Sequence, residues 1–158
     1  MNILVLCTGN SARSILLESI FNHTGNGRVH AYSAGSNPTG KVHPQSLTLL
    51  GEKGHEVRDA RSKSWDEFAA EDAPEMDLVI TVCGSAAEET CPVWPGAPVR
   101  AHWGVEDPAA AIEADWDTAF RTAYDILGRR AEALLALPLE TMDGGELTAQ
   151  LKRIGTLA

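Results

Sequence analysis

The chain is predicted to fold as an α/β domain around a parallel sheet, and two observations predict this class. First, short apolar segments alternate with segments of helical periodicity along the 158 residues, with no repeat or low-complexity linker between them. Second, Ile3–Leu6 is apolar without alternation, and Leu78–Val82 is almost wholly apolar. Such runs are typical of strands that are covered on both faces, as in a parallel sheet.

The first half of the chain contains two strand–helix pairs. Strands are expected at about 2–6 and 29–34, followed by helices at about 14–23 and 43–53. The first helix is expected to end at Gly25-Asn26-Gly27, because glycine is common just beyond helix ends. Pro44 suits the first turn of the second helix.

The second half begins with a short helix at about 64–70, a central strand at 78–82 and a short strand at 99–102. A long helix is expected over 116–137, where Pro138 stops it. Its apolar face comprises Trp116, Phe120, Ala123, Leu127, Ala131 and Leu134. We therefore predict one domain, residues 1–137, and a C-terminal appendage, residues 138–158, which is not a separate domain and packs on the domain or on a second subunit.

Composition and charge argue against several classes of partner and location. The net charge of −9 argues against nucleic acid and anionic membrane surfaces as partners. No apolar run approaches the roughly 20 residues that span a membrane. The short apolar run at the N-terminus lacks a basic region before it, so it is interpreted as a strand rather than a signal peptide. With an odd number of cysteines as well, a cytoplasmic protein with free thiols is expected.

The segment between the first strand and the first helix is the strongest functional signal. We call it the oxyanion loop; it comprises Cys7, Thr8, Gly9, Asn10, Ser11, Ala12, Arg13 and Ser14. Successive backbone N–H groups at a helix N-terminus, with an arginine, suit a tetrahedral oxyanion. The same field is expected to lower the pKa of Cys7 and to make it a nucleophile. A Cys-x5-Arg spacing also occurs by chance, and a cysteine after a strand is often simply buried.

Three further residues are candidates for this site. Cys83 ends the central strand, so it should lie near Cys7 if the two strands are neighbours. Cys91 follows after a small, polar segment, and the two thiols are either buried and inert or partners in disulfide exchange. Asp107, stiffened by Pro108, could donate a proton to a leaving oxygen or cap the next helix.

These motifs, with Tyr32-Ser33-Ala34-Gly35 and His102-Trp103-Gly104, resemble the arsenate reductases built on the low-molecular-weight protein tyrosine phosphatase fold. The resemblance covers about residues 1–137 and implies a four-stranded parallel sheet flanked by helices. It implies that Cys7 attacks arsenic, Arg13 and the loop amides bind the oxyanion, and Asp107 protonates the departing hydroxyl. Cys83 would then release arsenite by forming a disulfide with Cys7, and Cys91 would leave a Cys83–Cys91 disulfide for thioredoxin.

The chain departs from the family pattern in three places. Ala12 stands where many relatives carry a second cysteine, and residues 139–158 have no counterpart in the compact members. Seven residues separate Cys83 from Cys91, one more than in the best-known thioredoxin-coupled members, so glutaredoxin with glutathione is the alternative reductant. No tightly bound cofactor is expected. Some members bind potassium beside the loop, through residues that match Asn10, Glu18, Ser33 and Asp66.

Two other functions use the same residues. A phosphatase would need only Cys7, Arg13 and Asp107, but Ala109 and Ala110 follow Asp107-Pro108, where tyrosine phosphatases usually carry aromatic residues. A thiol sensor of arsenite or redox state would turn nothing over, and the basic DNA-binding region that such a regulator needs is not visible. Reduction of a small inorganic oxyanion is therefore the favoured hypothesis.

Overall fold

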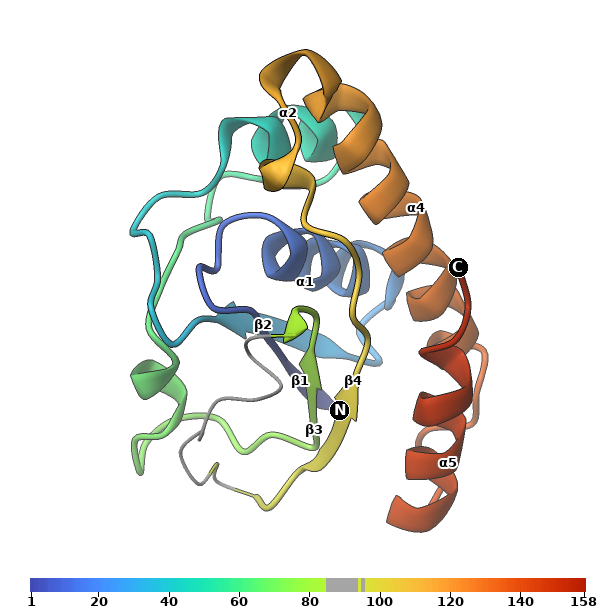
Figure 1. Ribbon diagram of the computed structural model, residues 1–158. Helices are drawn as coiled ribbons and strands as arrows, with labels where there is room; N and C mark the ends of the chain where they lie inside the picture. Colours follow the sequence, from blue (N-terminus) through green and yellow to red (C-terminus); the bar gives the residue numbers. More distant parts are fainter. Residues whose placement is uncertain (85–93, 95) are drawn as a thin grey trace.

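The computed structural model describes all residues except 85–93 and 95. Its four strands, β1 (Asn2–Leu6), β2 (His30–Ala34), β3 (Leu78–Thr81) and β4 (Val99–His102), form one parallel sheet in the order β2-β1-β3-β4 (Figure 1). At the carboxyl end of β1, Leu6 pairs with Ala34 on one side and Thr81 on the other. The predicted four-stranded parallel sheet with flanking helices is therefore confirmed.

The helices predicted at 14–23, 43–53 and 116–137 form with small shifts at their ends, as α1 (Arg13–Thr24), α2 (Pro44–Glu52) and α4 (Trp116–Leu135). The appendage contains a further helix, α5 (Gly144–Ile154). The segment expected as a short helix at 64–70 forms a single 3-10 turn, η1 (Trp65–Phe68), which Ser64 caps. The helix that Asp107 could cap is a 3-10 turn, Pro108–Ala110. A second 3-10 turn, Glu113–Asp115, is too short to show an apolar periodicity and was not expected.

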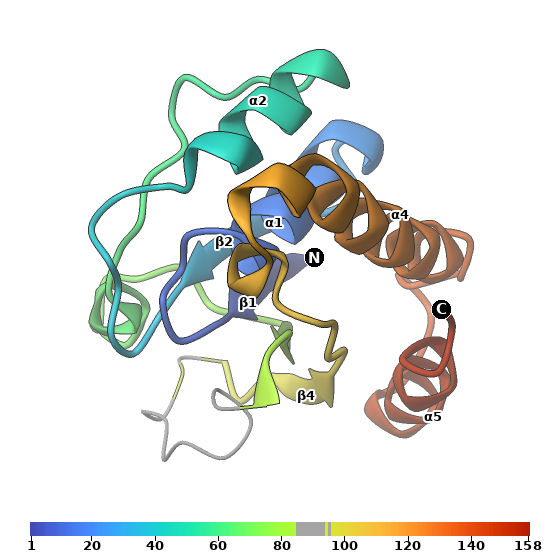
Figure 2. The ribbon, with the colours of Figure 1, turned by 45° about the horizontal axis from the view of Figure 1, so that its top comes forward.

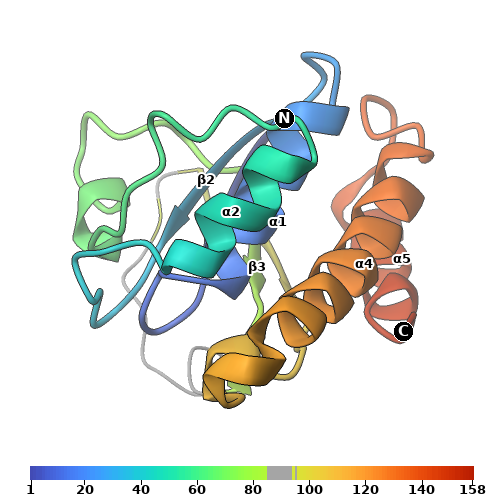
Figure 3. The same ribbon diagram turned by 90° about the horizontal axis from the view of Figure 1, so that it is seen from above.

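The two faces of the sheet bury different residues. Ile3 and Val5 pack with the apolar faces of α1, α2, α4 and α5, and the three helices α1, α2 and α4 lie together over this face (Figure 3). Leu4 and Leu6 point the other way and pack with Phe68 of η1. Both faces of β1 are thus buried, which accounts for its unbroken apolar sequence.

Helix α5 packs on the same domain. Leu147, Leu151 and Ile154 are buried in the main core, and α5 lies beyond strand β4 at the edge of the sheet (Figures 1 and 2). The indole N–H of Trp103, just after β4, donates to the Leu151 carbonyl at 3.1 Å. The boundary near residue 137 itself stays a prediction.

Arg130 of α4 ties this segment to the loop after β4. Its side chain is buried, with Nε donating to the Leu157 carbonyl at 2.9 Å and a terminal nitrogen donating to the Trp103 carbonyl at 2.9 Å.

The described helices include none with the length and apolar character that crossing a membrane requires.

Candidate active site

The oxyanion loop leaves β1 at the carboxyl edge of the sheet and leads directly into α1. In Figure 2 it lies between the segment that precedes α2 and the segment that follows β4. Asn10 adopts a left-handed conformation, with φ of 46°, which asparagine tolerates better than most residues. Ala12 precedes α1 and offers no side-chain cap, so the first amide groups of this helix need another acceptor.

Three carbonyl groups of the loop, those of Thr8, Gly9 and Ser11, accept hydrogen bonds from other segments, and these bonds hold the loop in shape. The pairs are Thr8 O with Asn37 N (3.0 Å), Gly9 O with Thr39 N (3.1 Å) and Ser62 Oγ (3.2 Å), and Ser11 O with His43 N (3.0 Å) and Ser46 Oγ (3.0 Å).

The amide groups on the concave side are available to a ligand. Among the hydrogen bonds of the described residues, none is made by the backbone N–H groups of residues 10–14. The Nε of Arg13 is likewise buried, with no hydrogen-bond partner in the described part of the chain. Donors of this kind, at the positive end of a helix, form a site for an anion.

Gly35 lets the loop approach strand β2. A Cβ atom at this position would lie 2.3 Å from the Thr8 carbonyl oxygen and 2.5 Å from that of Cys7. Both neighbours are backbone atoms and have no side-chain freedom to move away. Only glycine fits here, which explains one residue of the motif Tyr32-Ser33-Ala34-Gly35 in physical terms.

Arg13 and Asp107 face each other across the opening of the loop. One terminal nitrogen of Arg13 donates to the Val105 carbonyl at 3.0 Å, and the other lies 3.7 Å from Asp107 Oδ2. Asp107 Oδ1 accepts from the Ala109 amide at 3.0 Å, so the cap predicted for it forms. The Asp107 side chain is 42% exposed and has access to both the opening and solvent.

His43 lies near this carboxylate, although the sequence suggested only that it starts a helix. Its Nδ1 accepts from the Gln45 amide at 3.0 Å, and its ring packs edge-on against Trp116. Burial lowers the pKa of His43, and the charge of Asp107 opposes that shift. Arg13 is the cation that forms an ion pair with Asp107 in the described structure.

Strands β1 and β3 are neighbours, so Cys83 lies beside the oxyanion loop as predicted. Its Sγ accepts a hydrogen bond from the Thr8 amide at 3.4 Å, and both Cys7 and Cys83 are buried. Cys91 and most of the small, polar segment before it lie outside the described residues.

The predicted lowering of the Cys7 pKa is wrong for this arrangement. The neighbouring Cys83 thiol raises the pKa of Cys7, and burial raises it further; Arg13 and the Gly9 amide act in the opposite direction but are outweighed. Two thiols placed side by side cannot both ionise readily, so the pair holds one proton tightly. The sequence could not show that the second thiol would be this near.

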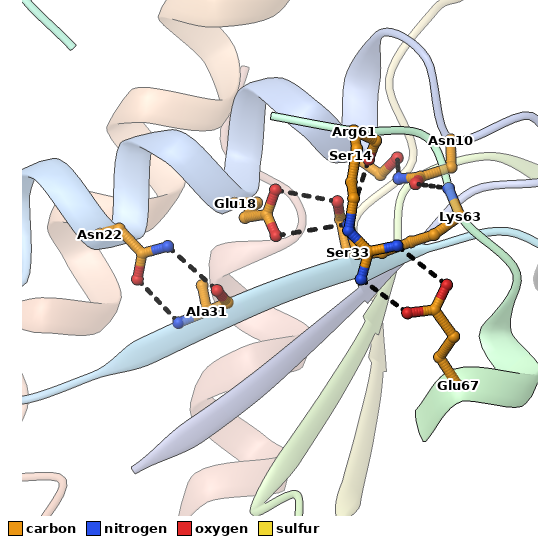
Figure 4. A network of polar contacts seen from close by, with 9 residues as sticks. All are labelled: Asn10, Ser14, Glu18, Asn22, Ala31, Ser33, Arg61, Lys63 and Glu67. Atoms are coloured by element: carbon orange, nitrogen blue, oxygen red, sulfur yellow. Dashed lines mark hydrogen bonds and ion pairs between the residues drawn. The ribbon is translucent and has the colours of Figure 1, made fainter. Parts of the chain in front are cut away.

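Three of the four residues proposed for potassium already have hydrogen-bond partners within the chain. Asn10 Oδ1 accepts from the Lys63 amide at 2.9 Å, and Glu18 Oε1 accepts from Ser33 Oγ at 3.0 Å (Figure 4). Asp66 is exposed on η1 and makes no hydrogen bond or ion pair with the other three in the described structure. No group of three or more His, Cys, Asp or Glu among the described residues could hold a metal ion.

The fold and the strand–loop–helix site define a class, and comparison with known proteins identifies it. The chain belongs to the family of low molecular weight phosphotyrosine protein phosphatases, whose model matches residues 2–151. Within this family its curated relatives include arsenate reductases. The protein of this name from Halalkalibacterium halodurans is 36% identical over 127 residues, covering 79% of this chain and 88% of the relative. That from Bacillus subtilis is 35% identical over 128 residues, with the same coverage.

Solved structures of arsenate reductases resemble the structure of this chain. An arsenate reductase in its oxidized state superposes with a TM-score of 0.69 at 27% identity, covering 85% of this chain and 96% of the other. A thioredoxin-dependent arsenate reductase from Corynebacterium glutamicum gives a TM-score of 0.53 at 26% identity, covering 80% of this chain and 61% of the other. The resemblance seen in the sequence motifs is confirmed.

Proposed function

We propose that the protein reduces arsenate to arsenite, with Cys7 as nucleophile and the oxyanion loop as the binding site. The observation that carries this proposal is the second buried thiol, Cys83, hydrogen-bonded to the Thr8 amide within the loop. Hydrolysis of a phosphate ester needs one thiol, whereas reduction needs a second one within reach of the first. The arsenate reductases among the relatives support the same choice.

The first step forms a bond between Cys7 sulfur and arsenic. The negatively charged oxygens of the bound arsenate accept hydrogen bonds from the loop amides and from Arg13. A hydroxyl group on arsenic takes a proton from Asp107 and leaves as water. Because the neighbouring Cys83 thiol and burial raise the pKa of Cys7, we infer that its proton leaves during this step. An oxygen of the oxyanion, held beside the sulfur, is the nearest base for that proton.

The second step transfers two electrons. Cys83, as its thiolate, attacks Cys7 sulfur; the sulfur–arsenic bond breaks and its electron pair stays on arsenic, which leaves as arsenite. Cys91 then attacks Cys83, frees Cys7 as a thiolate and leaves a Cys83–Cys91 disulfide. An external dithiol returns this disulfide to two thiols, and we propose thioredoxin for that role, with glutaredoxin and glutathione as the alternative. This cycle requires a reducing compartment, in line with a cytoplasmic location.

The experiment is steady-state arsenate reduction with the thioredoxin and glutaredoxin systems side by side. We expect turnover with thioredoxin that is abolished in Cys7→Ser, and a Cys83–Cys91 bridge in peptide maps after one equivalent of arsenate. Substantial activity in Cys7→Ser would refute the mechanism. Free Cys91 with a glutathione adduct elsewhere would replace the three-thiol relay by a glutaredoxin cycle.

A phosphatase activity of the same site is the second candidate, because Cys7, Arg13 and Asp107 lie together and the family model is that of a phosphatase. It is tested with p-nitrophenyl phosphate. Hydrolysis that is unaffected by Cys83→Ala, without any arsenate turnover, would favour the phosphatase.

A further inference from the structure

A buried ion pair stands where the potassium hypothesis placed a metal ion. Glu18, on α1, has a side chain only 18% exposed, and Lys63, which precedes η1, has one only 7% exposed. Their charged groups approach with Lys63 Nζ 3.9 Å from Glu18 Oε2, and Ser33 Oγ of β2 donates to the other carboxylate oxygen (Figure 4). A buried carboxylate needs a compensating cation, and Lys63 supplies it from within the chain.

The position of the ammonium group is fixed by a second contact. Lys63 Nζ donates to the Arg61 carbonyl at 3.1 Å, while the Arg61 guanidinium turns outward to an exposed pair with Glu67. Burial lowers the pKa of Lys63 and raises that of Glu18, and each charge offsets part of the cost to the other. The charge of Arg61 also lowers the pKa of Glu18, but less than that of Lys63 does, and Lys63 is the cation in contact with Glu18.

The backbone of Lys63 holds the oxyanion loop at the same time. Its amide donates to Asn10 Oδ1 at 2.9 Å, and the Asn10 side chain in turn donates to Ser14 Oγ at 2.9 Å. Its carbonyl accepts from the Gly35 amide at 3.0 Å. The residue that neutralises Glu18 thus also fixes the buried, left-handed Asn10 at the centre of the loop.

We propose that the Lys63 ammonium takes the place that potassium holds in some members of the family, so that this protein positions its oxyanion loop without a metal ion. The oxygen atoms that could bind potassium are present on Asn10, Glu18 and Ser33. Each of these side chains already has a hydrogen-bond partner within the chain. Lys63 acts as a positioning residue, because it reaches the oxyanion only through Asn10 and the loop. This inference deepens the proposed function, since the loop that Lys63 holds is the arsenate site.

The test measures unfolding and phosphate binding, neither of which requires arsenate reduction. For the wild-type protein we expect the same Tm and the same Kd for inorganic phosphate in KCl, NaCl and choline chloride at equal ionic strength. Any ion that binds only the folded chain would raise Tm with its concentration. A saturable rise in Tm with K⁺ but not with Na⁺ or choline would overturn the proposal.

Removal of the Lys63 ammonium group should make the stability and phosphate affinity of the protein dependent on K⁺. In Lys63→Met we expect Tm to fall by on the order of 10 °C, because a buried carboxylate loses its partner. We also expect phosphate affinity to weaken about fivefold or more, and K⁺ to restore part of both losses. The matched control is Lys152→Met on the exposed side of α5, which removes the same charge and should leave Tm, phosphate affinity and the response to K⁺ unchanged.

A double variant keeps the test decisive if Lys63→Met folds poorly. Glu18→Gln/Lys63→Met removes both charges, and we expect it to be more stable than Lys63→Met alone and to show no response to K⁺. If the double variant is no more stable than the single one, or if Lys63→Met keeps wild-type Tm and phosphate affinity, Lys63 is not the internal cation. If the Tm and phosphate-binding results are as expected but the wild-type protein does not reduce arsenate, the proposed function is refuted and the role of Lys63 stands.

Discussion

Replacement of Gly35 by alanine tests whether the shape of the oxyanion loop depends on one close backbone approach. The added Cβ would lie 2.3 Å from the Thr8 carbonyl oxygen, against about 3.4 Å for the lower end of ordinary contact. The difference, 3.4 − 2.3, requires the loop and β2 to separate by about 1 Å. Since Gly35 also donates to the Lys63 carbonyl and accepts from Trp65, it cannot withdraw without losing these bonds.

Two effects of different size follow from that displacement. We expect the free energy of unfolding to fall by about 1–3 kcal/mol, the usual cost of forcing an extra methyl group into a packed site. We expect kcat/KM for arsenate to fall by about 10²-fold, because a catalytic group misplaced by 1 Å costs that much. Phosphate affinity should fall as well, since the carbonyls that move belong to the loop.

The assays are urea unfolding, phosphate titration and arsenate turnover, with Gly128→Ala as the matched control. Gly128 lies inside α4 with nothing within 4 Å of an added Cβ, so alanine there should stabilise the protein by about 0.5–1 kcal/mol and leave turnover unchanged. A Gly35→Ala variant with wild-type stability and phosphate affinity would refute the reasoning.

Three other changes probe the site and its support. Asp107→Asn keeps an oxygen for the Ala109 amide but loses the acid, so single-turnover kinetics should show the first step slowed by about 10²–10⁴-fold, and an unchanged rate would leave only the capping role. Cys83→Ala removes the main cause that raises the pKa of Cys7, so iodoacetamide should alkylate Cys7 faster at pH 7, as followed by peptide mass spectrometry; a slower reaction would contradict this sign. Arg130→Met leaves the Trp103 and Leu157 carbonyls without their donor, so urea unfolding should show a loss of about 1–3 kcal/mol; equal stability would mean that water replaces the guanidinium.

The fold and the reactive loop could be predicted because their signals are local. The unbroken apolar strand before Cys7 and the helical pattern after Arg13 place the loop, and parallel strand order places Cys83 beside it. The cap at Asp107 follows from the proline after it. Each of these depends on residues adjacent in sequence or on one general rule of sheet topology.

What the sequence could not show depends on contacts between distant segments. Lys63 lies in a polar stretch where a solvated lysine is the ordinary expectation, yet it is buried against Glu18, 45 positions before it. The direction of the Cys7 pKa shift likewise depends on how near Cys83 comes and on burial, which no local pattern encodes. His43 near Asp107 is a third case of this kind.

Helix α5 runs along the outermost strand of the sheet. An alanine Cβ at Gly144, at the start of the helix, would lie 3.8 Å from Val99, and one at Gly155, just beyond its end, 3.2 Å from the His102 carbonyl. The helix therefore lies beside β4 at both of its ends, along an edge of the sheet that could otherwise pair with a strand of another molecule. Shortening the chain to residues 1–137 would uncover this edge, and we expect such a truncated form to associate sheet to sheet and precipitate, whatever the condition of its thiols.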